Sequence, residues 1–223
     1  MNYKRFVGNL ALFGAAVLIG AVRLVSAAQP AAVTPDEALK RLQDGNRRFA
    51  TDRPIHGAHH RKRMAEVVNT QKPFAVVVAC SDSRVAPEIV FDDDLGEIFV
   101  VRSAGHVVDD VELGSIEYGV EHLGASLVFM VGHERCGAVA AALSGEAAEG
   151  HVSAVIKAIL PSVQSTRGQP GDHAENAMRA NVRRVVRQLE ADEPVLTERV
   201  KTGKLKIVGA RYDLDTGLVE LLR

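Results

Sequence analysis

The stretch "FAVVVACSDSRV" (residues 74–85) decides the fold, because an apolar run passes directly into a polar loop. Residues 74–79 are short, rich in valine and free of polar interruptions, which is typical of a strand covered on both faces. Cys80, Asp82 and Arg84 follow at once on the loop. The pattern therefore predicts a buried strand that ends in chemically reactive side chains.

Further runs of this kind predict the rest of the sheet: "EIFVVR" (97–102), "SLVFMVG" (126–132) and "LKIVGARY" (205–212). Between them lie helical patterns at 110–124, capped by Asp110 and ended by Gly124, and at 136–145 and 173–189. Alternation of strands and helices indicates an α/β fold with a central, mainly parallel β-sheet flanked by helices. We expect four parallel strands and a C-terminal antiparallel strand in "DTGLVELL" (215–222).

An N-terminal helical arm precedes the sheet. Thr34 is the expected N-cap of a helix that starts at Pro35 and runs to about Phe49, with Glu37 placed to complete a capping box. A second helical pattern, basic on one side and apolar on the other, covers residues 59–68.

Residues 1–28 have the three parts of a secretory signal: a basic start, an apolar stretch at 6–22 and small residues before the expected cleavage point. An uncleaved membrane anchor is the alternative. We predict cleavage, a mature domain at 29–223, a periplasmic location and no membrane contact afterwards. Losing the three basic residues of 1–28 changes the formal net charge from -1 to -4, which argues against nucleic acid as a partner.

Only two cysteines occur, Cys80 and Cys136. In an oxidising compartment two cysteines suggest a disulfide, and their spacing does not exclude one. However, Cys80 follows one predicted strand, while His133 and Cys136 follow another. If those strands are neighbours, the three side chains meet at one edge of the sheet. Two thiolates and an imidazole form a zinc set with an open fourth position, and thiolates disfavour magnesium and calcium.

The order of these motifs also carries a resemblance. "CSDSRV" (80–85) and "GHERCGAV" (132–139), joined by "VVRSAGHVV" (100–108) and "LGSIEYGVEHLG" (113–124), resemble the beta-class carbonic anhydrases, and the match covers most of residues 34–223.

The resemblance implies one Zn²⁺ per subunit, held by Cys80, His133 and Cys136. It also implies two roles for Asp82, as a fourth ligand in a closed form or as the partner of Arg84 in an open form, where its carboxylate orients the attacking hydroxide.

Four further residues match positions that contact substrate in the family: Gln71, Phe99, Tyr118 and Gly137. Gln71 is expected to donate an amide hydrogen bond and Gly137 a backbone amide. For Phe99 and Tyr118, packing in the core explains the residue type nearly as well.

Two residues depart from the family pattern near the site: His106, where asparagine is common, and Glu134, where a small polar residue is usual. We interpret His106 as a structural histidine in preference to a proton shuttle.

The leading hypothesis is a zinc enzyme that hydrates carbon dioxide reversibly to bicarbonate and a proton. Hydrolysis of carbon disulfide or carbonyl sulfide at the same site, and non-catalytic zinc binding or redox sensing, are the alternatives. The resemblance implies a homodimer or a dimer of dimers.

Overall fold

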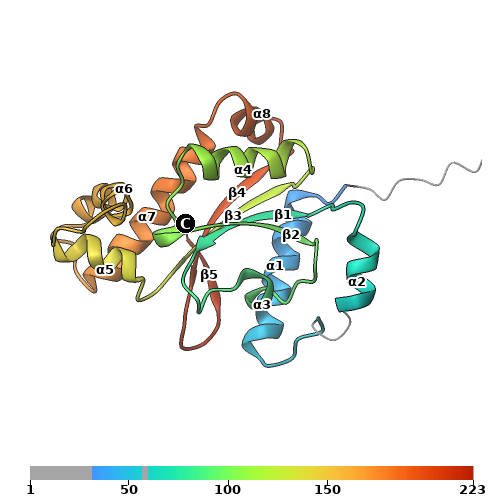
Figure 1. The fold of residues 1–223 in the computed structure, drawn as a ribbon, viewed down its shortest axis with the longest axis horizontal. Helices are drawn as coiled ribbons and strands as arrows, with labels where there is room; N and C mark the ends of the chain where they lie inside the picture. Colours follow the sequence, from blue (N-terminus) through green and yellow to red (C-terminus); the bar gives the residue numbers. More distant parts are fainter. Residues whose placement is uncertain (1–31, 57–59, 223) are drawn as a thin grey trace, which may run out of the picture. The chain divides into compact units, whose positions relative to one another are not determined.

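The computed structural model describes residues 32–56 and 60–222, and it contains a five-stranded sheet flanked by helices (Figure 1). The strand order is β2-β1-β3-β4-β5. Strands β1 to β4 are parallel, and β5 is antiparallel to β4. The bounds are β1 Ala75–Cys80, β2 Ile98–Ser103, β3 Leu127–His133, β4 Lys206–Tyr212 and β5 Val219–Leu222. The predicted fold class is confirmed.

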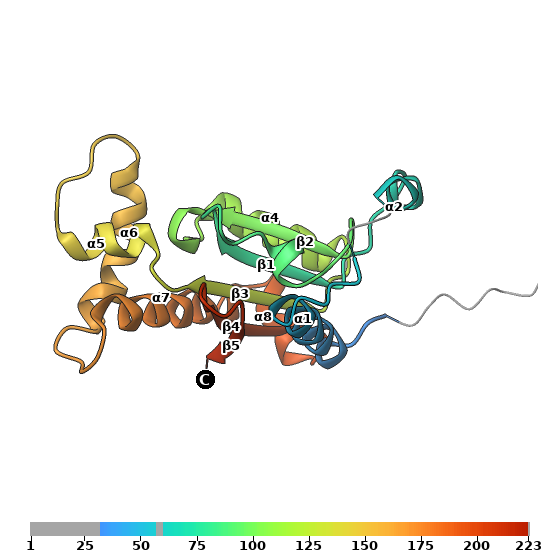
Figure 2. The same cartoon turned by 90° about the horizontal axis from the view of Figure 1, so that it is seen from below.

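Helices cover both faces of this sheet (Figure 2). Their bounds are α1 Pro35–Ala50, α2 His60–Val67, α3 Pro87–Val90, η1 Ala104–His106 (a 3₁₀ turn), α4 Asp110–Glu121, α5 Gly137–Ser144, α6 Val152–Ser165, α7 His173–Glu190 and α8 Val195–Lys201. Helices α4 and α7 contact the sheet through one core, and α1 and α3 belong to the other.

The central strand β1 separates the two cores. Val76 and Val78 belong to the core on the α4 and α7 side, whereas Ala75 and Val77 belong to the core on the α1 and α3 side. Successive side chains of a strand point to opposite faces, and every residue of β1 is buried. The uninterrupted apolar run that starts at Phe74 thus reflects burial on both faces.

The start of α4 differs slightly from the prediction. Asp109, one residue before Asp110, is the N-cap, and its side chain accepts a hydrogen bond from the Val111 amide at 3.0 Å. Glu112 lies three residues later and reaches back to the Asp109 amide, so the pair forms a capping box. That spacing of three residues selects Asp109 as the cap.

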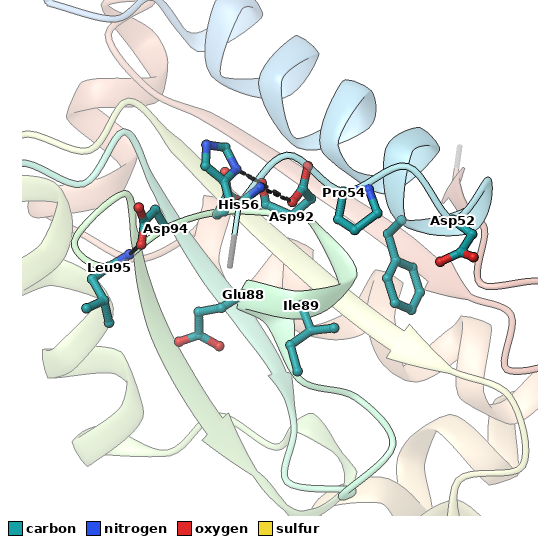
Figure 3. Close-up of a pocket in the computed structure, with 10 residues that line it drawn as sticks. Asp52, Pro54, His56, Glu88, Ile89, Asp92, Asp94 and Leu95 are labelled. Carbon is teal, nitrogen blue, oxygen red and sulfur yellow. Dashed lines mark hydrogen bonds and ion pairs between the residues drawn. The ribbon is translucent and has the colours of Figure 1, made fainter. Parts of the chain in front are cut away.

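A cavity of about 400 Å³ lies where α1, the 52–56 segment and α3 meet (Figure 3). Asp92 is 3 % exposed and holds this corner together. Its carboxylate accepts hydrogen bonds from Arg48 and from the backbone amides of Ile55 and His56. These interactions explain why an acidic residue is tolerated in a buried position.

Asp93 lines the same cavity without such support. Its Oδ2 is buried and has no hydrogen-bond partner. Burial, with repulsion from Glu97, raises the pKa of Asp93 to about 8. Between about pH 4 and pH 8 the folded chain therefore binds this proton more tightly than the unfolded chain does, so the contribution of Asp93 to stability falls as the pH rises.

Asp93→Asn is expected to stabilise the fold at pH 8.5 by on the order of 2 kcal/mol, because it removes a buried charge that costs about 1.4 kcal/mol per unit of pKa shift. At pH 4 the gain should vanish. Urea unfolding at the two pH values measures this, with Asp52→Asn, an exposed residue beside the same cavity, as the control. An equal gain at both pH values would contradict the assignment.

Candidate metal centre

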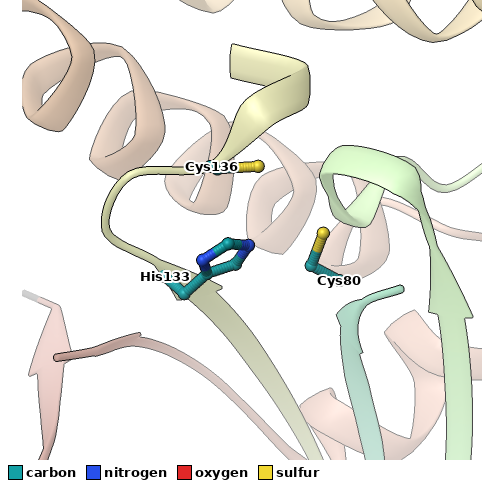
Figure 4. A group of neighbouring side chains, drawn as sticks. All are labelled: Cys80, His133 and Cys136. Carbon is teal, nitrogen blue, oxygen red and sulfur yellow. The ribbon is translucent and has the colours of Figure 1, made fainter. Parts of the chain in front are cut away.

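Three predicted ligands meet at the carboxyl edge of the sheet (Figure 4). Cys80 is the last residue of β1, and His133 is the last residue of the neighbouring strand β3. Cys136 is the N-cap of α5. One nitrogen of His133 and the sulfur atoms of Cys80 and Cys136 all lie within 4.8 Å of one another. Parallel pairing of β1 with β3 brings together residues that are 53 and 56 positions apart in the sequence.

The imidazole of His133 has one nitrogen engaged by the backbone and one without a partner. Its Nδ1 lies 2.9 Å from the backbone carbonyl oxygen of Glu134, and a carbonyl can only accept, so Nδ1 carries the proton and donates it. The remaining lone pair is therefore on Nε2. This atom is buried and has no hydrogen-bond partner. An unpartnered buried nitrogen beside two thiols fits a metal ion as its missing partner.

The two cysteines are buried and free. Hydrogen bonding with Cys136 lowers the pKa of Cys80, and the same contact with Cys80 raises the pKa of Cys136. One thiolate is thus favoured before any cation binds. The donor set of two sulfur atoms and one imidazole is the kind that zinc prefers, with one coordination position left for water.

The amide of Gly105 donates a hydrogen bond to the Cys80 sulfur at 3.3 Å. Gly105 has a φ of 67°, and a Cβ there would lie 2.6 Å from Cδ1 of Ile159. Only glycine fits this close approach. The turn η1 therefore supplies a backbone donor that fixes the position of the Cys80 sulfur.

Asp82 and Arg84 form a two-point ion pair beside the three ligands. Nε of Arg84 donates to Oδ1 of Asp82 at 2.9 Å, and Nη2 donates to Oδ2 at 2.8 Å. This contact lowers the pKa of Asp82 to about 2, so the carboxylate is charged at neutral pH. Oδ2 lies 3.9 Å from Nε2 of His133. In this arrangement the Asp82 carboxylate lies next to the three candidate ligands and is hydrogen-bonded to Arg84.

Arg102, which sequence reasoning missed, holds the loop that carries this pair. Its Nε donates to the carbonyl of Cys80 at 2.9 Å, and its Nη2 donates to the carbonyl of Asp82 at 2.8 Å. Arg102 lies on β2, the strand beside β1. The available signal was an arginine at the end of the run 97–102. That run predicts a buried strand, but it does not by itself predict that Arg102 contacts the loop after β1.

The four predicted substrate-binding residues separate into two places. Gly137 begins α5 directly after Cys136 and lies at the metal centre. Gln71 precedes β1 and is exposed, at the end of the strand opposite to Cys80. Phe99 on β2 pairs in register with Val76, whereas Ser103 pairs with Cys80. Phe99 lies four residues before Ser103, which corresponds to about 13 Å along the strand at 3.3 Å per residue.

Tyr118 on α4 contacts the ring of Phe99, with centroids 6.2 Å apart. Gln71, Phe99 and Tyr118 thus belong to the amino end of the sheet. A single chain does not bring them to its own metal centre.

His106 is fully buried, and neither ring nitrogen has a hydrogen-bond partner within the described residues. Burial lowers the pKa of His106, which favours the neutral ring. A ring without solvent contact cannot pass protons directly to water. The position therefore fits the structural interpretation better than the proton shuttle.

Glu134 connects the ligand loop to the C-terminal turn. Its Oε1 accepts from the Leu214 amide at 2.6 Å and from Arg135 at 3.0 Å, and its Oε2 accepts from Arg211 at 3.2 Å. The side chain is largely buried among these donors. Glu134 therefore fixes the segment between His133 and Cys136 from the outside.

Glu134→Gln is expected to weaken zinc affinity about tenfold, because groups that hold a ligand loop usually contribute 10- to 100-fold to metal affinity. Competition with a chromophoric zinc chelator measures the change. Glu220→Gln is the matched control, since Glu220 contacts Arg179 and lies outside the ligand loop. Equal zinc affinity in the two variants would show that Glu134 does not position the ligands.

Comparison with known proteins gives consistent findings. Residues 75–219 match the family model described as "Carbonic anhydrase". The chain is 41 % identical over 191 residues to "Carbonic anhydrase" of Mycolicibacterium smegmatis, covering 84 % of this chain and 93 % of that one. It is 42 % identical over 187 residues to "Carbonic anhydrase 2" of Mycobacterium tuberculosis, covering 82 % and 90 %.

Among solved structures, the Coccomyxa beta-carbonic anhydrase in complex with acetazolamide has a TM-score of 0.66 and 27 % identity, with coverage of 82 % of this chain and 86 % of that one. The beta-carbonic anhydrase CcaA has a TM-score of 0.67 at 24 % identity, with coverage of 83 % and 95 %, and shows likeness of fold.

Proposed function

Because the chain belongs to the beta-class carbonic anhydrase family, we propose that it catalyses the reversible hydration of carbon dioxide to bicarbonate and a proton. We further propose that each subunit holds one Zn²⁺ through Cys80, His133 and Cys136. The observation that carries the proposal is the convergence of three buried ligand atoms within 4.8 Å beside the Asp82–Arg84 pair.

When bound, zinc supplies a Lewis acid that brings the pKa of a coordinated water to about 7. The protein contributes orientation. The charged carboxylate of Asp82 accepts a hydrogen bond from the attacking water and directs its lone pair toward the carbon atom of the substrate. Arg84 holds that carboxylate by a planar two-point contact that lysine cannot reproduce.

We assign to the backbone amide of Gly137 the role of donor to the oxygen atoms of the developing bicarbonate, which its position in the first turn of α5 supports. A helix amino terminus favours this anionic product over neutral carbon dioxide. Differential stabilisation of this kind lowers the barrier instead of only tightening substrate binding.

The functional unit is proposed to be at least a homodimer. Strand β2 is an edge strand, and beside it lie the exposed apolar side chains of Val111 (75 % exposed) and Tyr118 (47 %). Such an edge is suited to pairing with another chain. If two β2 edges meet antiparallel, the amino end of one sheet lies beside the carboxyl end of the other. That geometry brings Gln71 of the partner subunit toward the metal centre.

Val111→Glu is expected to convert the dimer to monomer and to reduce turnover at least tenfold, because it places a charge in an apolar interface and separates each centre from the opposite Gln71. Light scattering after gel filtration and a CO2 hydration assay measure the two effects. Val152→Glu, an equally drastic change of an exposed valine on α6, is the control. A monomeric, fully active wild type would refute the dimer.

The central experiment combines metal analysis with activity. The purified protein should contain about one zinc per chain and should hydrate CO2 in a stopped-flow pH-indicator assay. Carbonyl sulfide and carbon disulfide are assayed in parallel. A protein that contains zinc but does not hydrate CO2 would contradict the proposal. Faster turnover of carbonyl sulfide or carbon disulfide would show that the sulfur compound, and not CO2, is the preferred substrate.

A periplasmic location is also proposed, supported by the three-part pattern of residues 1–28, which lie outside the described residues. Among the helices of the described part, none is long and apolar enough to cross a membrane. Cell fractionation followed by N-terminal sequencing tests this. A full-length chain in the cytoplasmic fraction would contradict it.

A further inference from the structure

A second cavity, of about 520 Å³, lies between α6 and α7. It is lined by hydroxyl, amide and guanidinium side chains, including four arginines of α7: Arg179, Arg183, Arg184 and Arg187. Arg183, Arg184 and Arg187 follow Arg179 by four, five and eight residues, a spacing that places the four arginines along one side of the helix. No residue proposed for the metal centre lines this cavity, and no acidic residue does.

The positive charge in this cavity is only partly neutralised. Arg179 is paired with Glu175 at 2.7 Å and with Glu220 at 3.1 Å. Among the described residues, no carboxylate lies within ion-pair distance of Arg184 or Arg187. The cavity therefore contains two guanidinium groups without an anionic partner.

Arg184 is also held in place. Its Nη2 donates to Oδ1 of Asn181 at 3.3 Å. Asn181 is fully buried and is itself fixed by Ser162 at 3.1 Å and by the carbonyl of Gly105 at 3.2 Å. A guanidinium restrained in this way loses little conformational freedom when a ligand binds.

One donor of Arg184 is unsatisfied, because its Nε is buried and has no hydrogen-bond acceptor. Burial, followed by repulsion from Arg187, lowers the pKa of Arg184. An anion between the two guanidinium groups would relieve the repulsion between Arg184 and Arg187.

The hydroxyl groups of the lining do not compete for this role. Those of Ser165 and Thr166 donate to backbone carbonyls within α6, at 2.9 and 3.1 Å. The amide of Asn176 likewise donates to the carbonyl of Pro170. The guanidinium N–H groups of Arg184 and Arg187 are thus candidate donors to a ligand, and they favour an acceptor that carries negative charge.

We propose that the α6–α7 cavity is a binding site for a divalent oxyanion of the phosphate class, held by Arg184 and Arg187. Two guanidinium groups match the charge of a dianion and the fork geometry of its oxygen atoms. The cavity is also large enough for a phosphate monoester of a small organic molecule, since ligand pockets commonly measure about 300–1,000 Å³. The proposal does not rest on the function proposed for the metal centre, because no candidate metal ligand lines this cavity.

The test is a titration of the zinc-loaded, isotopically labelled protein with inorganic phosphate and with glycerol phosphate at constant ionic strength, followed by ¹H–¹⁵N NMR. Saturable shifts are expected at amides of α6 and α7. The dissociation constant should rise at least tenfold in Arg187→Gln and further in the variant that also carries Arg184→Gln. Tighter binding of the monoester would identify an organic phosphate as the ligand, and equal binding would identify the inorganic ion.

Arg61→Gln removes the same charge from exposed α2 and should leave the titration unchanged. Because Arg187 is exposed, its single variant is expected to fold even if replacement of Arg184 does not. Absence of saturable shifts in the wild type would overturn the proposal. So would shifts confined to the metal centre, or binding that is unchanged in Arg187→Gln.

Discussion

Cys136→Ser is expected to reduce bound zinc from about one per chain to less than about a tenth, and to abolish CO2 hydration. A neutral hydroxyl is a much poorer zinc ligand than a thiolate. The loss also leaves only Cys80 and His133, too few to complete the three-ligand set typical of a catalytic zinc site. Zinc content by mass spectrometry of the metal, together with turnover, measures the effect.

The control for this variant is Ser81→Ala, which changes an exposed side chain next to Cys80 and removes no ligand. It should retain zinc and most of the activity. The assignment would be wrong if the wild-type protein, purified from its exported form, contained a Cys80–Cys136 disulfide and no zinc. It would also fail if Cys136→Ser retained full zinc occupancy.

Asp82→Asn is expected to keep zinc and yet lose at least about 100-fold in kcat, the scale typical of a positioned acid–base or orienting group. An amide presents a donor where the attacking water needs an acceptor, and it no longer balances the charge of Arg84. Since the pKa of Asp82 is about 2, the wild-type carboxylate is charged throughout the neutral range. The asparagine amide does not ionise, so raising the assay pH should not rescue the variant.

Arg84→Lys provides the complementary measurement. Lysine keeps the charge but cannot form both contacts with the Asp82 carboxylate, so an intermediate loss of turnover with unchanged zinc is expected. Near-normal turnover of Asp82→Asn would remove this carboxylate from the mechanism. Loss of zinc in the same variant would instead assign Asp82 as a ligand.

The strands and the three candidate ligands were predictable because their signals are local. Runs such as 74–79 and 127–132 contain no polar residue that competes with a buried strand, and parallel strands end at a common edge. The ligands follow those runs directly. Strand pairing of β1 with β3 was the only long-range assumption that the site required, and the structure contains that pairing.

Other features depend on contacts between distant segments and had no local signal. Helix α6 was not predicted, since Pro161 lies within it and usually interrupts a helix. The contacts of Glu134 with Leu214 and Arg211 join segments nearly 80 residues apart. Gln71 is close to Cys80 in sequence, but an extended strand separates the two residues in space.

The tautomer of His133 depends on a main-chain carbonyl, and this has a consequence for mutational tolerance. Any amino acid at position 134 supplies that carbonyl, so no single substitution there deletes the acceptor of the hydrogen bond that Nδ1–H donates. Variation at this position can alter how firmly the loop is held without reversing which nitrogen faces the thiols. The main chain thus determines which nitrogen of His133 is free to bind a metal ion. Substitutions at position 134 can change the affinity for the metal while the three candidate ligands stay the same.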